Sequence, residues 1–332
     1  MELTWLDRAN PDPQDVAGAV AAAEAARAVD LPHHPVHTVS MFLGRFRHGW
    51  DGQPPEVAVA KDSHGRVVGV VEIGLPWRDN THLAIVHPVT DPAVRTQAMV
   101  QALIGAASDR ARRDGRKVML VITADRPEYS AVASAMGFER GYDEIARRQD
   151  VRAVDWPRLD AEYAAAERRA EGYVLLRIAP TVPDDLLTRV TTLTAAINDA
   201  PTEGLHVEDE VYTPERIRAF ESANEGRNRR LYRVAARHRE SGELAGHTLL
   251  AIENEQPWYA YQYDTSVLAA HRGHRLGLLL KIDMLRWLRE IEPQVWFIDT
   301  ENAASNDHMI KVNELLGYEI VGRGIGWQRN LD

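Results

Sequence analysis

The stretch WYAYQYDTSVLAAHRGHRLG, residues 258–277, decides the fold prediction for this chain of 332 residues. Residues 258–267 are rich in aromatic and β-branched side chains, which predicts a β-strand. The basic turn HRGHRLG follows at 271–277, and residues 278–290 repeat apolar side chains at helical spacing. A strand, a basic turn with glycine and a helix start together indicate an anion site. Free backbone N–H groups and the helix dipole attract a phosphate, and glycine lets it approach the main chain.

The same order of elements occurs twice in the chain. GRVVGVVEI at 65–73 and GELAGHTLL at 242–250 each read as a tight turn into an apolar strand. A long amphipathic helix and a second strand follow in each case. Each half then closes on a short helix that ends in glycine, an aromatic residue and glutamate, at 137–139 and 317–319. The sequence therefore predicts two similar α/β (α+β) domains, each with a mixed sheet.

The join between the two repeats is expected near residue 160. Residues 156–172 begin with Trp-Pro and contain an alanine-rich, charged run that ends in glycine, as is typical of a connecting helix. We therefore expect an N-terminal domain over 1–155, a linker helix over 156–172 and a C-terminal domain over 173–332.

Composition restricts the classes of function. A net charge of −10 argues against a general nucleic-acid or anionic-membrane binder, because both partners would repel such a surface. The chain has no cysteine, which excludes disulfides, thiolate catalysis and cysteine-based zinc sites and fits a cytoplasmic protein. The start MELTW lacks a secretory signal pattern, and no stretch approaches about 18 apolar residues, so no membrane span is predicted.

The run PHHPVH, residues 32–37, has three histidines that could coordinate zinc. Prolines on either side, the lack of a patterned carboxylate and the lack of a counterpart in the other half favour a surface loop. No metal site is therefore expected.

Downstream of the basic turn, residues 293–300 read as a further strand, followed by two asparagines and the helix 307–315 before Gly317. This half resembles the GCN5-related N-acetyltransferase (GNAT) superfamily, whose motif Gln/Arg-x-x-Gly-x-Gly/Ala lies between the fourth strand and the third helix. Arg272 and Gly277 fit the outer positions, and Arg275 replaces the middle glycine. The whole chain is similar to tandem GNAT proteins of actinobacterial type. The resemblance implies two tandem GNAT folds, each a mixed, splayed central sheet flanked by helices.

The resemblance also implies acyl-CoA, in the first place acetyl-CoA, as the cosubstrate, with no metal. Its phosphates and pantetheine arm would contact the end of the fourth strand, the basic turn and the asparagines after the fifth strand. The residues implied to bind it are Ser266, Val267, Leu268, Arg272, Gly273, His274, Arg275, Leu276, Gly277, Asn302 and Asn306.

The corresponding stretch of the first half, VHPVTDPAVRTQAM at 86–99, contains no glycine. Asp91 in this stretch would repel a phosphate, and Ala133 stands where the second half has Asn313. We therefore expect the N-terminal domain to be degenerate and structural, and the C-terminal domain to bind the acyl-CoA and to be catalytic.

The implied reaction is direct attack of a small primary amine on the thioester. The protein must take a proton from the ammonium group and stabilise the oxyanion and the leaving thiolate. Asp264 in the fourth strand is the first candidate base, although it could equally cap a backbone group. Glu301 is the second candidate, and the acidic run 208–210, which could also be a solvated loop, is the third. A backbone N–H near 266–268 would polarise the carbonyl.

The superfamily usually places a tyrosine, the acid for the leaving group, four residues before its glycine–aromatic pair. Asn313 stands there in this chain. Asparagine cannot release a proton at useful pH, although it can hydrogen-bond the sulfur or hold a water. Either Tyr261, Tyr263 or Tyr318 donates the proton, or the thiolate leaves through water.

Two functions remain open from the sequence. The first is an acetyl-CoA-dependent N-acetyltransferase that acts on a small primary amine, as a cytoplasmic monomer or homodimer without nucleic-acid or membrane partners. The second is a non-catalytic acyl-CoA-binding regulatory module, because Arg275 and Asn313 replace the glycine and tyrosine of the superfamily.

Overall fold

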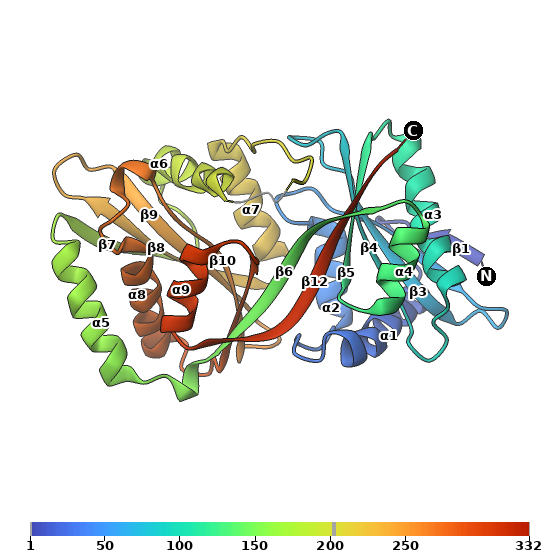
Figure 1. Cartoon of the computed structure of the whole chain (residues 1–332), viewed down its shortest axis with the longest axis horizontal. Coiled ribbons are helices and arrows are strands. Elements are labelled where there is room, and N and C mark those ends of the chain that lie inside the picture. Colours follow the sequence, from blue (N-terminus) through green and yellow to red (C-terminus); the bar gives the residue numbers. More distant parts are fainter. Residues whose placement is uncertain (1, 201–203, 332) are drawn as a thin grey trace. The chain divides into compact units, whose positions relative to one another are not determined.

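The computed structural model describes residues 2–200 and 204–331 (Figure 1). The chain divides into two compact units, here called unit 1 and unit 2. Unit 1 comprises Met1–Ile145, Thr202–Asp209 and Gly322–Asp332, and unit 2 comprises Ala146–Pro201 and Glu210–Val321. Each unit contains a sheet flanked by helices, as the α/β (α+β) prediction requires.

The sheet of unit 1 has the strand order β1-β2-β3-β4-β5-β12, in which β12 is Tyr318–Asn330. Strand β4 runs parallel to β5, and the other adjacent pairs are antiparallel. The elements of this unit are β1 (Glu2–Trp5), α1 (Pro13–Asp30), α2 (Val39–His48), β2 (Glu56–Lys61), β3 (Val67–Gly74), β4 (Leu83–Thr90), α3 (Gln97–Arg113), β5 (Val118–Ala124) and α4 (Pro127–Ala135).

The sheet of unit 2 has the strand order β6-β11-β10-β9-β8-β7, in which β6 is Glu139–Asp150. Strand β10 runs parallel to β11, and the pairs β7–β8, β8–β9 and β9–β10 are antiparallel. The elements of this unit are α5 (Trp156–Arg169), β7 (Tyr173–Ile178), α6 (Asp184–Ala195), α7 (Pro214–Gly226), β8 (Arg229–His238), β9 (Leu244–Glu253), β10 (Tyr259–Val267), α8 (Leu276–Ile291), β11 (Phe297–Ala303) and α9 (Asp307–Leu315).

Helices cover both faces of the sheet of unit 2 (Figure 1). The apolar residues of α8, such as Leu280 and Met284, are buried with Leu159 and Ala166 of α5 in one core cluster. Helices α6 and α7 cover the opposite face through two smaller clusters. Helix α5 is therefore packed into the core of unit 2, whereas the sequence suggested a linker at this place. None of the described helices is long and apolar enough to cross a bilayer.

In each unit the described pairing of the two parallel strands ends before their carboxyl ends. In unit 2 the described pairing joins residues Tyr259, Ala260 and Tyr261 of β10 to Phe297, Ile298 and Asp299 of β11. Beyond this point the register of β10 against β9 shifts between Gln262 and Thr265, which is the sign of a β-bulge. Bulges of this kind bend a strand, and no pairing of β10 with β11 is described beyond Asp299. The unpaired stretch between the ends of these two strands is here called the gap. The predicted splayed sheet is confirmed.

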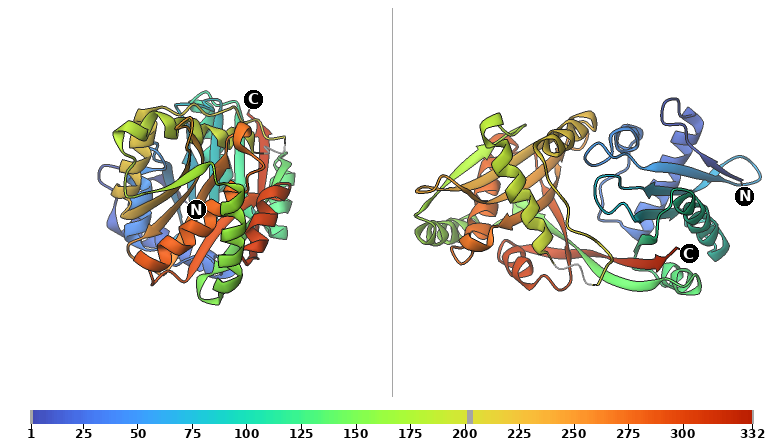
Figure 2. Two further views of the ribbon diagram at one scale, coloured as in Figure 1. Left: turned by 90° about the vertical axis from the view of Figure 1, so that its left-hand side faces the viewer. Right: turned by 90° about the horizontal axis from the view of Figure 1, so that it is seen from above.

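Two long strands pass from one unit to the other. Strands β6 (Glu139–Asp150) and β12 (Tyr318–Asn330) lie side by side, drawn in green and red in Figure 2. The last part of β12 pairs antiparallel with β5 in unit 1, from Gly324 opposite Ala124 to Asn330 opposite Val118. The C-terminal strand of the second repeat therefore completes the sheet of the first, an exchange that the sequence does not signal.

We predict that Trp327→Ala lowers the free energy of unfolding by about 3–5 kcal/mol, because this side chain of β12 is buried in the core of unit 1. Its indole Nε1 also donates to Thr123 Oγ1 at 3.2 Å. Urea denaturation monitored by circular dichroism measures the change. The control is Ile320→Ala on the same strand, which is 51% exposed and should cost under about 0.5 kcal/mol. Equal effects of the two substitutions would contradict the exchange of β12.

Candidate functional site: the gap between β10 and β11

The start of α8 provides backbone donors beside open space. Arg275 is the N-cap residue, and no side chain of the described residues caps the helix there. The first N–H groups of a helix have no partner within the helix, so those of Leu276 and Gly277 are available to an anion. A Cβ on Gly277 would meet no described atom within 4 Å. A phosphate could therefore approach the main chain here.

The backbone of the basic turn shows how Arg275 fits at a position where the superfamily motif has glycine. Arg275 has φ +57°, in the left-handed region, and Gly273 has φ +88°. Glycine adopts such angles without strain, whereas a residue with a Cβ does so at a cost of about 1–2 kcal/mol. Arg275 thus keeps the left-handed conformation that a glycine at this position would adopt freely.

Several side chains of the turn are engaged by the protein itself. Arg275 Nη2 pairs with Glu162 Oε2 of α5 at 2.8 Å, so this guanidinium is directed to α5. His274 Nδ1 lies 3.3 Å from the carbonyl oxygen of Arg169. His271 is buried between Tyr173 and Glu243, with ring-nitrogen contacts of 2.9 and 3.1 Å. These three side chains hold the turn in place.

Arg272 is the cation of the turn that lies beside β10. Its Nε donates to the carbonyl oxygen of Val267 at 3.1 Å, and its Nη2 pairs with Asp199. The side chain is about half exposed, so an anion can compete for it with Asp199. The side chain of Arg272 therefore lies between the start of α8 and the end of β10.

The end of β10 offers a backbone donor on the side of β11. Leu268 N–H donates to the carbonyl oxygen of Ala245 beside β9. Because backbone groups alternate sides along an antiparallel strand, the N–H of Val267 points away from β9, towards the gap. Ser266 is buried, and its Oγ donates to the carbonyl oxygen of Leu193. Of the three predicted residues, Val267 is the one suited to polarise a carbonyl.

Asp264 lies at the bulge of β10 in a polar cluster. Its Oδ2 is 3.8 Å from Nε2 of His247, and the other ring nitrogen of His247 contacts Arg233. Burial raises the pKa of Asp264, and the charge of Arg233 opposes part of that rise. Burial, reinforced by Arg233, holds the pKa of His247 well below its ordinary value, so the imidazole is neutral. A raised pKa makes a carboxylate a stronger base than a carboxylate with its ordinary pKa.

Glu301 lies at the end of β11 and accepts a hydrogen bond from Tyr261 OH at 2.9 Å. Burial raises its pKa, although the bond from Tyr261 opposes this. The Tyr261 ring contacts Tyr263, which contacts Phe220 of α7. Glu301 is therefore on the face of the sheet that α6 and α7 cover. Tyr261 and Tyr263 are bound to Glu301 and Arg229 respectively, which does not favour either as the acid for a thiolate.

The asparagines after β11 lie on the side of α8 and α9. Asn313 is buried, and its Nδ2 donates to Asn302 Oδ1 at 2.9 Å. Its own Oδ1 accepts from the ammonium group of Lys281 at 2.7 Å. Asn306 is the N-cap of α9, where its Oδ1 accepts from the backbone N–H of Met309 at 3.3 Å. Tyr318, the third candidate acid, is buried, and burial raises its pKa.

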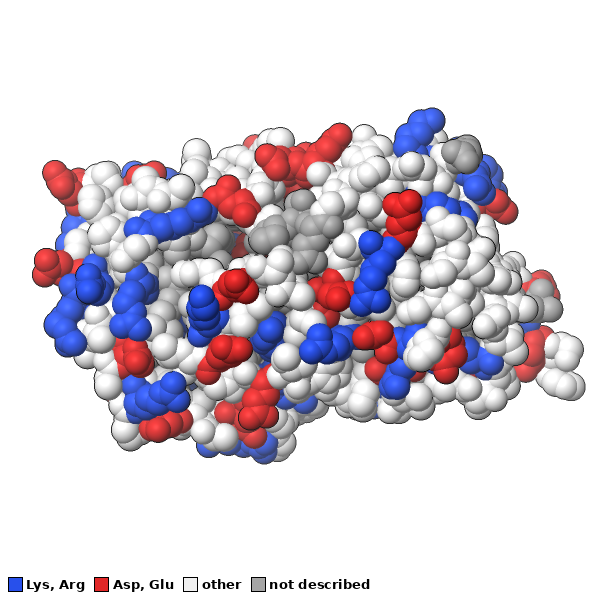
Figure 3. Space-filling model, viewed as in Figure 1, with Lys and Arg blue, Asp and Glu red and all other residues white. Residues whose placement is uncertain are grey.

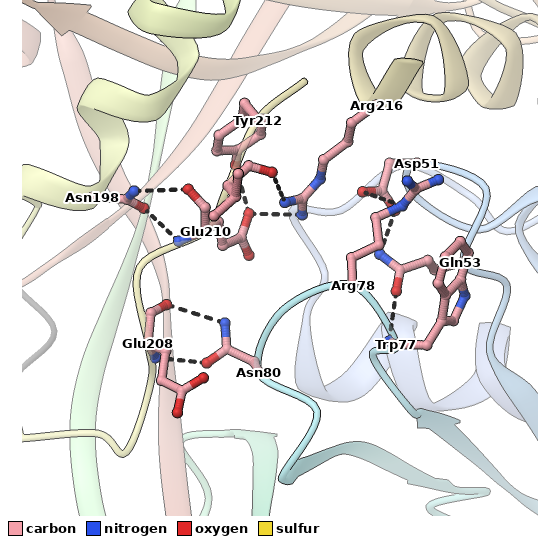
Figure 4. Close-up of polar contacts among 11 residues, drawn as sticks. Asp51, Gln53, Trp77, Arg78, Asn80, Asn198, Glu208, Glu210, Tyr212 and Arg216 are labelled. Atoms are coloured by element: carbon pink, nitrogen blue, oxygen red, sulfur yellow. Dashed lines mark hydrogen bonds and ion pairs between the residues drawn. The ribbon is translucent and has the colours of Figure 1, made fainter. Parts of the chain in front are cut away.

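The acidic run 208–210 is fixed by asparagine side chains (Figure 4). Within unit 2, Asn198 bonds both the N–H and the carbonyl oxygen of Glu210, at 3.1 and 3.0 Å. Glu210 Oε2 accepts from Tyr212 OH and Arg216 Nη2. Within unit 1, the backbone of Glu208 is bonded in the same two-sided way by Asn80. Glu210 is therefore held as an ion-pair partner, which weakens its candidacy as a base.

In unit 1, the N-terminus of α3 corresponds to that of α8, and side chains of the protein occupy it. Thr96 caps α3 through Oγ1, which accepts from the backbone N–H of Met99. Asp91 accepts from the N–H of Ala93 at 3.0 Å and pairs with Arg66. Arg95, the nearby cation, pairs with Asp30. The groups that would receive a phosphate are thus occupied by side chains.

Sequence reasoning missed three residues of the site, namely Arg233, His247 and Lys281. Lys281 follows Gly277 by one helical turn and interrupts an apolar run, which is a usable signal. Arg233 and His247 lie in strands of otherwise ordinary composition, and only the pairing of β8, β9 and β10 places them beside Asp264.

The charged surface shows no dominant sign on the face drawn in Figure 3, where acidic and basic side chains are interspersed. The described residues contain no group of three or more His, Cys, Asp or Glu side chains placed to hold a metal ion.

No protein-family model matches the chain, and no curated protein is similar to it in sequence. Among solved structures, the chain is similar to a tandem GNAT protein from the clavulanic acid biosynthesis pathway, with 26% identity, a TM-score of 0.80, and coverage of 100% of this chain and 99% of that one. It is also similar to a GCN5-related N-acetyltransferase from Sphaerobacter thermophilus, with 14% identity, a TM-score of 0.69 and coverage of 99% and 96%. A GCN5-related glucosamine N-acetyltransferase region of a fungal β-N-acetylglucosaminidase aligns with a TM-score of 0.68 and 13% identity, over 98% of this chain and 38% of that one.

The fold is therefore that of the GNAT N-acetyltransferases, with a mixed sheet that splays between two parallel strands. The full-length match shows the arrangement of a tandem GNAT protein, as the duplicated sequence predicted.

We predict that Arg275→Gly is more stable than Arg275→Ala by about 1 kcal/mol, because glycine relieves the left-handed backbone. Both substitutions remove the ion pair with Glu162, so their difference isolates the backbone effect. Urea denaturation midpoints of the two variants give the comparison. Equal midpoints would show that residue 275 does not require the left-handed conformation.

Proposed function

We propose that the chain is an acyl-CoA-dependent, in the first place acetyl-CoA-dependent, N-acyltransferase that acts on a small primary amine in its second half. The observation that carries the proposal is the gap between β10 and β11 next to the uncapped start of α8. The similarity to solved N-acetyltransferases supports the reaction class.

The residues beside the gap fit a CoA thioester. The N–H groups of Leu276 and Gly277 and the guanidinium of Arg272 would bind the pyrophosphate, since both donate to anions and Gly277 faces open space. The amides of Asn302 and Asn306 would bind the pantetheine arm. The bound thioester supplies an activated acyl group, and the N–H of Val267 would polarise its carbonyl.

The opposite face of the gap fits an amine. Asp264 and Glu301 are carboxyl groups with raised pKa, and Asp264 is our choice for the base that accepts the ammonium proton. His247 Nε2 lies 3.8 Å from Asp264 Oδ2, and the charge of Arg233 favours the ionised form of this carboxyl. Glu301 would contribute negative charge that attracts a cationic acceptor.

The first half is proposed to be structural. Thr96, Asp91 and Arg95 close the helix start that a cosubstrate would need, and the core of unit 1 depends on the last part of β12. We thus propose that the N-terminal half is degenerate and that the C-terminal half binds the acyl-CoA and is catalytic.

A non-catalytic acyl-CoA-binding module is the second candidate. The observation that favours it is the engagement of Asn313 by Lys281 and Asn302, which leaves the usual acid position without a proton donor. Calorimetric binding of acetyl-CoA together with background CoA release across a broad panel of amines would select this module over the enzyme.

We predict that Gly277→Glu weakens acetyl-CoA binding at least about 100-fold, because a carboxylate beside the pyrophosphate repels it. Isothermal titration calorimetry measures the affinity. Ala98→Glu is the matched control, since Ala98 is exposed and is also the second residue of its helix, α3. Loss of binding in folded Ala98→Glu would refute the structural role of the first half.

We predict that Asp264→Asn abolishes turnover and leaves acetyl-CoA affinity unchanged. As the base, Asp264 must be deprotonated, so wild-type turnover should rise with pH through its raised pKa, whereas any residual turnover of the variant should not. A pH–rate profile for an amine that the enzyme accepts tests this. Unchanged turnover in the variant at every pH would remove Asp264 as the base.

The free energy of unfolding provides a second test of Asp264→Asn. A carboxyl with a raised folded pKa contributes stability that is present below its unfolded pKa, about 4, and is lost as the pH rises through the folded value. The free energy of unfolding of wild type should therefore fall over this window relative to that of Asp264→Asn.

A further inference from the structure

A buried lysine lies beside the gap and has no role in the chemistry described so far. Lys281 of α8 is 3% exposed. Its Nζ donates to Asn313 Oδ1 at 2.7 Å and lies 4.7 Å from the centre of the Tyr318 ring. Its neighbours on either side, Leu280 and Ile282, are fully buried. No described carboxylate forms an ion pair with it.

Placing an ammonium group in such surroundings is costly. Burial of an ion without a partner of opposite charge costs several kcal/mol, and methionine would fill the same volume without that penalty. Burial lowers the pKa of Lys281 to about 7. The group is therefore poised to become fully charged when a negative charge arrives nearby.

The hydrogen bonds of Lys281 lead towards the gap. Lys281 donates to Asn313, and Asn313 Nδ2 donates to Asn302 Oδ1 at 2.9 Å. Asn302 belongs to the part of β11 that lies beyond the pairing with β10, and it is partly exposed. The positive charge of Lys281 polarises the side-chain amides of Asn313 and Asn302. It thereby strengthens the N–H donors of Asn302, the partly exposed residue of the three.

We propose that Lys281 is a positioning residue that orients Asn313 and Asn302 and, through them, stabilises the thiolate that leaves in the acyl transfer. This inference rests on the proposed function. It assigns to a lysine–asparagine–asparagine chain the position at which the superfamily has a tyrosine acid.

The step balances without a proton donor at this position. The ammonium group first gives one proton to Asp264, which passes it to solvent. The neutral nitrogen then forms a bond to the acyl carbon and gives a second proton to the same carboxylate. The C–S bond breaks, and its electron pair stays on the sulfur as a thiolate. A free thiol has a pKa of about 8.5, so the thiolate then takes a proton from solvent. Lys281 is protonated when the thiolate forms, and its positive charge lowers the energy of the thiolate.

The test measures the thiol pKa of bound coenzyme A by the ultraviolet absorbance of the thiolate, and so needs no acceptor amine. With wild-type protein we expect a thiol pKa about one unit lower than with Lys281→Met, because the positive charge favours the thiolate. Lys311→Met removes an exposed lysine from α9 and should match wild type.

A second variant guards against misfolding as an explanation. Asn313→Leu breaks the chain but keeps Lys281, and it should raise the thiol pKa as Lys281→Met does, with no further rise in the double variant. Equal thiol pKa values in wild type and both single variants, each binding coenzyme A by calorimetry, would overturn the inference and leave the proposed function intact. Failure of wild type to bind coenzyme A would overturn the proposed function itself.

Discussion

The separation of β10 from β11 is the constraint on which the site depends. Three paired positions, ending at Tyr261 and Asp299, hold the strands together, and the bulge between Gln262 and Thr265 then turns β10 away. A paired strand offers its backbone groups to its neighbour, whereas an unpaired stretch between two strands offers them to a ligand. The N–H of Val267 is available for this reason. The bulge thus leaves a short stretch of the β10 backbone available to a ligand, while the remaining backbone of the strand stays paired.

Ionisable groups lie on both faces of the gap. On the face covered by α6 and α7 are the carboxyls of Asp264 and Glu301, with Arg233 near Asp264, and on the other face is Lys281 of α8. An amine that attacks a thioester creates a mobile proton on one side and a negative sulfur on the other. The arrangement of charges matches that separation. Removal from water accounts for the directions of the pKa shifts, because it disfavours the charged form: it raises the pKa of Asp264 and Glu301 and lowers the pKa of Lys281.

The sequence predicted those features that depend on local pattern. The strand at 258–267, the helix at 307–315 and the duplication follow from periodicity and turn chemistry, and the structure has them. Features that depend on pairing between distant segments could not be read in this way. The contact of His247 with Asp264 requires the register of β9 against β10, and the hydrogen bond from Lys281 to Asn313 requires the packing of α8 against α9. The role of Arg275 was open for the same reason, because its partner Glu162 is far away in sequence.

The exchange of β12 gives the first half a structural role that does not require it to bind a cofactor. Residues Gly324–Asn330 of β12 find their antiparallel partner in β5, and Ile325 and Trp327 are buried in the core of unit 1. Without the first half, this strand would present unpaired backbone groups and two large apolar side chains to water. The same strand begins at Tyr318, whose ring contacts Lys281 in the second half. The structural role proposed for the first half therefore does not depend on cofactor binding there, because the pairing of β12 with β5 carries it.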